Sequence, residues 1–69
     1  MDGREMDVLL NQEDAAKILL VKPKSLEAWR HRGGGPPFVR VGRLVRYSRL
    51  SLLAWIRSRT VRSTSEEIL

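Results

Sequence analysis

Arginines stand where the sequence most clearly suggests chemistry. Arg40, Arg43 and Arg46 lie in the segment FVRVGRLVRYS, in which two runs of strand-forming residues flank Gly42 and Arg43. Glycine at the first position of a two-residue connection indicates a type II′ β-hairpin, and the turn places Arg43 at the tip. An arginine beside a glycine tip has little structural reason to be basic. Such a cationic finger suits a polyanion, and nucleic acid is the first candidate.

The two faces of this hairpin are predicted to differ, because residues that pair directly across the turn share a face. One face carries Phe38, Arg40, Val45 and Tyr47. The other carries Val39, Val41, Leu44 and Arg46. Neither face is purely polar, and we expect the aromatic one to pack inward. We predict that Arg43 enters a narrow minor groove, while Arg40 and Arg46 meet phosphates or are simply solvated.

A basic helix is predicted from Pro23 to Arg32, since proline fits a first helical turn and the following GGGPP ends a helix. Leu26 and Trp29 define its inner face, so Lys24 and His31 point outward. Lysine can donate to guanine, serine can bind a phosphate or a base, and alanine can contact a thymine methyl. The alternative is an ordinary polar helix face. The predicted DNA-binding residues are Lys22, Lys24, Ser25, Ala28, His31, Arg32, Arg40, Arg43 and Arg46.

Charge is distributed unevenly over the 69 residues, whose net charge is +5. Residues 1–20 hold two basic and five acidic side chains, residues 21–62 hold eleven basic and one acidic, and residues 63–69 hold two acidic ones. This asymmetry is typical of a nucleic-acid surface, although a solubilising face or a module that binds an acidic protein has the same pattern. An anionic membrane is a weaker alternative, because no long helix pairs a basic face with a broad apolar one.

Several classes of function are disfavoured by composition. There are no cysteines and one histidine, so we expect no metal site, no cofactor and no disulfide. No nucleophile, base and carboxylate have a recognisable catalytic spacing, so we expect that the protein is not an enzyme. Gly33–Gly35 follows a helix and lacks the Lys-Ser/Thr ending of a phosphate loop. Without a signal peptide or a long apolar run, we expect a soluble protein in the cytoplasm.

One small domain over residues 8–59 is expected, between a flexible N-terminus (1–7) and a flexible C-terminal tail (60–69). The fold class is mainly α with a small β-hairpin. Helices are predicted at about 12–20, 23–32 and 49–59, with Asn11 and Ser48 as N-caps of the first and third. The expected core is Leu10, Ala15, Ala16, Leu19, Val21, Leu26, Trp29, Phe38, Val45, Tyr47, Leu52, Trp55 and Ile56.

Residues 9–57 resemble the MerR-like winged helix-turn-helix domain of phage excisionases and AlpA-type prophage regulators. The resemblance is carried by Leu10 before an acidic helix start, Ala15-Ala16, Leu26 with Trp29, Pro36-Pro37-Phe38, Val41-Gly42-Arg43 and Ala54-Trp55-Ile56. It implies that the second helix reads the major groove and that the hairpin is a wing on the adjacent minor groove. This sequence departs from the family at Leu20, where glycine is usual, at Lys22, where a serine cap is common, and at Ser51, where aspartate is common.

The function that we expect from this resemblance is that of an excisionase. Such a recombination directionality factor binds and bends double-stranded attachment-site DNA, so that a tyrosine integrase excises a prophage or an integrative element. Cooperative self-association on DNA is a further expectation. The alternatives are a small AlpA-like transcription regulator and a basic protein-interaction module.

Overall fold

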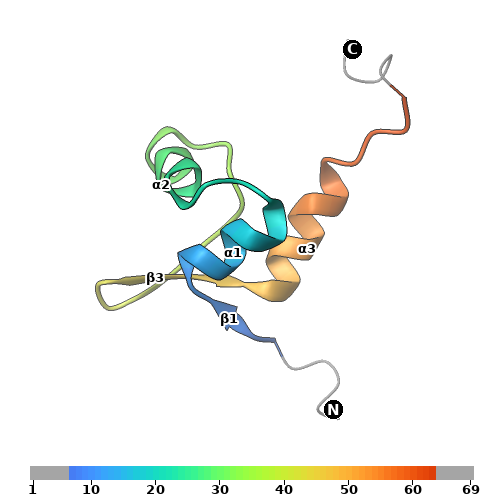
Figure 1. The fold of residues 1–69 in the computed structure, drawn as a ribbon. Coiled ribbons are helices and arrows are strands. Elements are labelled where there is room, and N and C mark those ends of the chain that lie inside the picture. Colours follow the sequence, from blue (N-terminus) through green and yellow to red (C-terminus); the bar gives the residue numbers. More distant parts are fainter. Residues whose placement is uncertain (1–6, 64–69) are drawn as a thin grey trace.

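The computed structural model describes residues 7–63. Its elements in chain order are β1 (Leu9–Leu10), α1 (Gln12–Leu19), α2 (Pro23–Arg32), β2 (Val39–Val41), β3 (Leu44–Ser48) and α3 (Arg49–Ser58). The β2–β3 hairpin extends away from the helices on the same side of the molecule as α2, and α3 lies on the opposite side (Figure 1). Three helices with a projecting hairpin form a winged helix-turn-helix fold, as the sequence predicted.

The turn between α1 and α2 is made by a left-handed leucine. The Asn11 side chain accepts a hydrogen bond of 2.7 Å from the Asp14 backbone N–H and so caps the start of α1. The helix ends at Leu19, slightly before the predicted end, because Leu20 adopts φ 58° and ψ 42°. This is the position where the resemblance expects glycine, and the Leu20 side chain is 91% exposed. The tight turn is therefore kept, but without the residue that adopts it most easily.

The hairpin has the predicted register, with Val39 opposite Arg46, Arg40 opposite Val45 and Val41 opposite Leu44. Gly42 has a φ of 62°, and Arg43 does not share this positive φ, which is the pattern of a type II′ turn. The sheet also has a strand that was not predicted, because β1 pairs antiparallel with β3 and the order is β1-β3-β2.

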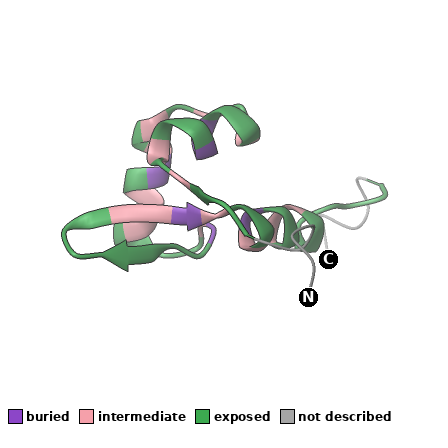
Figure 2. Ribbon diagram, turned by 90° about the horizontal axis from the view of Figure 1, so that it is seen from below, coloured by how far each residue is buried: buried purple, intermediate pink, exposed green. Residues whose placement is uncertain are grey.

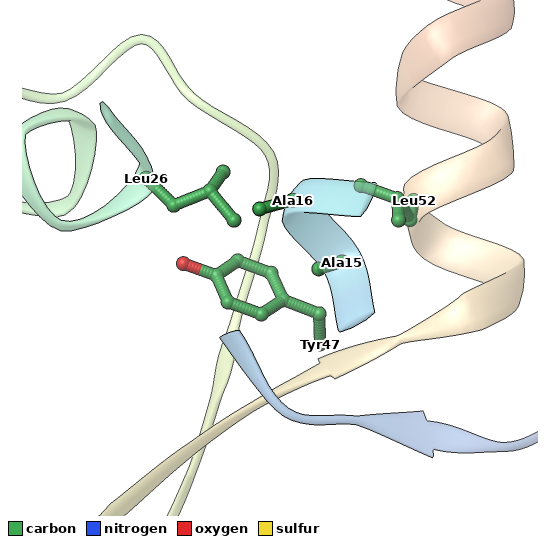
Figure 3. Close-up of a cluster of buried hydrophobic side chains, with 5 residues drawn as sticks. All are labelled: Ala15, Ala16, Leu26, Tyr47 and Leu52. Atoms are coloured by element: carbon green, nitrogen blue, oxygen red, sulfur yellow. The ribbon is translucent and has the colours of Figure 1, made fainter. Parts of the chain in front are cut away.

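The core lies between the sheet, α1 and the inner sides of α2 and α3 (Figure 3). Tyr47, Leu26 and Leu52 are the large fully buried side chains in the part of the chain that the structure describes. Alanines at 15 and 16 are also buried, which lets the sheet and the other helices approach α1 closely. The partly buried residues packed against this centre are Leu10, Leu19, Val21, Trp29, Val45 and Ile56.

The aromatic face of the hairpin is the one that packs inward, as expected, but only over part of its length. Tyr47 is fully buried and Val45 is partly buried, whereas the outer-face residues Val39 and Val41 are exposed. Figure 2 shows that β2 is exposed throughout, whereas most of β3 is intermediate or buried. The prediction that Phe38 belongs to the core was wrong, because its ring is 37% exposed and lies at the edge of Tyr47 with a centroid separation of 6.4 Å.

The start of α3 receives two oxygen acceptors. The Ser48 hydroxyl accepts from the Ser51 backbone N–H at 3.1 Å and is the predicted N-cap. Asp7, in the N-terminal segment, accepts from the Leu50 backbone N–H at 3.1 Å and also from the Ser48 hydroxyl. The hydroxyl of Ser48, followed by the N–H of Leu50, lowers the pKa of the Asp7 carboxyl from its ordinary value of 3.8. An acidic residue supplied from outside the helix thus stands in for the aspartate missing at Ser51.

Candidate nucleic-acid interface

The outward side of α2 is basic and exposed. Lys24 and His31 are seven residues apart and both exposed, so they lie along one face, and Arg32 is exposed beside them. Ser25 and Ala28, also predicted as DNA-binding residues, are half-buried rather than freely exposed. The exposed Glu27 interrupts this basic face. The accessible basic groups of α2 are therefore concentrated toward its two ends.

The first turn of α2 has neither a capping side chain nor an acid. Lys22 occupies the N-cap position with φ −76° and ψ 145°, and its side chain makes no capping hydrogen bond. Pro23 at the first helical position has no N–H to satisfy. The positive end of the helix dipole therefore coincides with the positive charges of Lys22 and Lys24, which makes this end of α2 attractive to an anion.

The three hairpin arginines occupy different surroundings. Arg43 is exposed at the tip. Arg40 is exposed on the inward face, with its guanidinium carbon 5.9 Å from the centroid of the Phe38 ring. Arg46 is half-buried on the outer face and donates from Nη1 to the Val45 carbonyl oxygen at 2.8 Å. The structure thus brings Arg40 and Arg43 to the inward face and tip of the hairpin, while Arg46 lies on the face turned away from the core.

One arginine of α2 was given no binding role in the sequence analysis and makes several contacts. Arg30 donates from Nη1 to the Gln12 Oε1 atom at 2.6 Å and to the Tyr47 hydroxyl at 2.8 Å. Its guanidinium carbon also lies 5.9 Å from the Phe38 ring centroid. Gln12 is 18 residues and Tyr47 is 17 residues from Arg30 in the sequence, so helical periodicity does not predict these contacts.

The glycine loop after α2 is fixed against α3. The rings of Trp29 and Trp55 are 6.1 Å apart, and the Arg59 guanidinium lies 4.7 Å from the Trp55 centroid. Arg59 also donates to the Gly34 carbonyl oxygen at 2.9 Å. A Cβ atom added to Gly35 would lie 2.6 Å from the Trp29 Cβ, so a side chain there cannot fit without movement of the backbone. The end of α2 is therefore held both by close packing and by hydrogen bonds, since the Gly33 N–H also donates to the Trp29 carbonyl oxygen at 2.7 Å.

A winged helix-turn-helix fold with basic groups on its second helix and its hairpin defines a DNA-binding protein. Residues 9–60 match the family described as helix-turn-helix domain, and the chain belongs to this family. The family consists of small DNA-binding, non-catalytic domains, and membership indicates binding to double-stranded DNA. Among curated proteins, none shows significant similarity to this chain. Within residues 7–63, no helix has both the length and the apolar character required to cross a lipid bilayer.

Proposed function

We propose that this protein is an excisionase, a recombination directionality factor that shapes attachment-site DNA for a tyrosine integrase. The observation that carries the proposal is the placement of a basic helix and a projecting arginine-tipped hairpin on one side of the same small fold. Two elements that enter adjacent grooves can hold DNA in a bent path, because the bend brings both grooves onto the protein. The resemblance to excisionases supports the same role.

In this proposal α2 lies in the major groove. Lys24 and His31 face the bases, and the half-buried Ser25 and Ala28 approach the groove wall where the helix is closest to DNA. Lys22, at the positive end of the helix dipole, binds a phosphate. Arg32, at the other end of the helix, binds the DNA sugar-phosphate backbone on the opposite side of the major groove.

The hairpin is the proposed wing. Arg43 enters the minor groove, where a narrow groove concentrates negative potential. Arg40 meets a phosphate between the two grooves, since its guanidinium lies on the inward face of the hairpin. We assign Arg46 a weaker phosphate role, because its guanidinium is already bonded to the Val45 carbonyl and faces outward.

The first experiment measures sequence-specific binding. A DNA duplex is selected by the full chain from a random library, and its affinity is compared with that of a scrambled duplex of the same composition. We expect the selected duplex to bind more tightly and both affinities to fall steeply between about 50 and 200 mM salt. Equal affinities for the two duplexes would contradict sequence-specific reading.

The second experiment tests the biological role. Integrase-dependent excision is measured with and without the protein, on a substrate that carries the attachment sites of the element. We expect excision to require the protein, and we expect Arg43→Ala to reduce it while the fold remains intact. The same site would also serve a small transcription regulator. In that case promoter activity changes with the protein and excision does not. A module that binds an acidic protein would change neither promoter activity nor excision.

A further inference from the structure

Arg30 joins the two elements that the proposed function places in adjacent grooves. It belongs to α2, and its Nη1 atom donates to the Tyr47 hydroxyl on β3 at 2.8 Å. The same nitrogen donates to Gln12 at the start of α1 at 2.6 Å. Figure 3 shows the Tyr47 hydroxyl on the side of the ring nearest to Leu26 of α2. A single guanidinium therefore bonds α2, α1 and the strand that forms half of the hairpin.

Phe38 extends this connection toward the hairpin. Two guanidinium groups approach its ring, those of Arg30 and Arg40, each 5.9 Å from the ring centroid. The ring is also 6.4 Å from Tyr47, whose side chain is fully buried. The partial exposure of Phe38 is consistent with a contact at the edge of the core, where α2 and the hairpin face one another.

The backbone arrangement makes this side-chain connection important. Among the most closely packed pairs of elements, α2 packs against α1, whereas β3 packs against β1, β2, α1 and α3. The buried Leu26 anchors α2 to the core and Trp29 packs near Trp55 of α3, but these apolar contacts do not fix direction as a hydrogen bond does. A rotation of α2 relative to the hairpin would break the bonds that Arg30 makes.

We propose that Arg30 is a positioning residue that sets the orientation of α2 relative to the hairpin, so that both meet DNA in register. The inference rests on the proposed use of α2 and the hairpin as two parts of one DNA surface. Arg30 acts through Tyr47, Gln12 and Phe38, and it does not itself contact the DNA.

The central test is Tyr47→Phe, which removes the hydroxyl but keeps the buried ring and every charge. We expect the affinity for the selected duplex to fall about three- to tenfold, as for the loss of one buried hydrogen bond. The affinity for the scrambled duplex should remain unchanged, since no charge is removed from the protein. Gln12→Met, which removes the other acceptor, should have a smaller effect of the same kind and serves as a second variant if Tyr47→Phe does not fold.

Coupling to the wing tip separates positioning from a purely structural role. In the wild-type chain Arg43→Ala should lower the affinity for the selected duplex about tenfold. In the Tyr47→Phe background, Arg43→Ala should lower the affinity for the selected duplex only about two- to threefold, because the misaligned tip contributes less. A purely structural role predicts the same fold-change in both backgrounds at a temperature where both proteins are folded.

Three results would overturn the inference. The first is a Tyr47→Phe protein that binds the selected duplex as tightly as wild type. The second is an Arg43→Ala effect of equal size in both backgrounds. The third is an Arg30→Met protein whose binding depends less steeply on salt, by the amount expected for about one lost phosphate contact. That result would make Arg30 a direct DNA contact. If the wild-type chain does not discriminate the selected duplex from the scrambled one, the proposed function fails as well, and that result is seen before any variant is made.

Discussion

The three helices of this domain begin in two different ways. α1 begins at a capping asparagine followed by Glu13 and Asp14, and α3 begins at Ser48 with Asp7 alongside. α2 begins at Lys22, with no capping side chain and no acid in its first turn. Among the described residues, side-chain oxygens accept from the first-turn N–H groups of α1 and α3. At the start of α2, Pro23 has no N–H and the Ser25 N–H donates to the Lys22 carbonyl oxygen at 2.9 Å. In the proposed function the basic start of α2 faces a DNA phosphate, which an acidic cap at that end would repel.

Under the proposed function, acidic residues stabilise the starts of α1 and α3, and DNA binding falls to α2. Carboxylates near the start of α2 would stabilise the helix and repel DNA. At the start of α1 or α3 they stabilise the helix without that cost, provided that those ends lie away from the DNA. The variants below test the comparison, beginning with the largest expected effect.

The first variant, Trp29→Ala, tests the packing that holds the C-terminal end of α2 against α3. Trp29 is half-buried, and its ring lies 6.1 Å from that of Trp55 at a tilt of 42°. Truncation therefore removes the packing that fixes the end of the helix. We expect a loss of about 3 kcal/mol or more, enough to unfold most of a marginally stable domain. Circular dichroism melts measure the effect, with Lys24→Ala as a surface control. A cooperative melt close to that of wild type would show that the pair is dispensable.

The second variant, Lys22→Asp, gives α2 the start that α1 has. The new carboxylate caps the helix and should stabilise the fold by about 1 kcal/mol, while affinity for the selected duplex should fall by about tenfold or more. Urea denaturation and salt-dependent binding give the two readouts. Asn11→Ala is the matched control at α1, where we expect about 1 kcal/mol of destabilisation and an unchanged salt dependence. Tighter or unchanged DNA binding by Lys22→Asp would contradict the comparison.

The third variant, Leu20→Gly, acts on the turn that separates the two kinds of helix start. Leu20 holds a left-handed conformation with an almost fully exposed side chain, so glycine relieves strain and loses little buried surface. The greater freedom of glycine in the unfolded chain offsets part of this gain, and we expect a net stabilisation of about 0.5–1 kcal/mol. Leu20→Ala, which keeps the strain, is the control and should not stabilise the fold.

The smallest effect is expected for Asp7→Asn at the start of α3. The pKa of Asp7 is lowered in the folded protein, so its ionised form stabilises the fold above the ordinary value of 3.8. This contribution is lost as the pH falls through the lowered pKa, because the unfolded chain then binds the proton more readily. The difference in Tm between wild type and Asp7→Asn should therefore be constant near neutral pH and shrink well below pH 3.8. A difference that persists in acid would assign the effect to packing.

The sequence predicted most of the local structure because its signals are local. Pro23 and the glycines after Arg32 mark the limits of α2, and Gly42 fixes the turn and thereby the register of the hairpin. The two-residue strand β1 was missed, since Leu9 and Leu10 are too few to show an alternating pattern. Their pairing with β3 is a tertiary event.

The candidate site was predicted less completely. The outward direction of Lys24 and His31 follows from helical geometry, and both are exposed in the structure. The contacts of Arg30 do not follow from periodicity, because they depend on where Tyr47 and Gln12 meet in space. The DNA contacts of all these residues stay predictions until the binding experiments are done.

The contact between Arg59 and the Gly34 carbonyl sets a limit on how the domain can be shortened or fused to other proteins. α3 ends at Ser58, so helix boundaries suggest a cut directly after it. Such a cut would remove the guanidinium that covers Trp55 and holds the loop after α2. A tag or reporter joined beyond Thr60 preserves the hydrogen bond between Arg59 and Gly34. One joined at Ser58 would remove that bond and so loosen the end of α2.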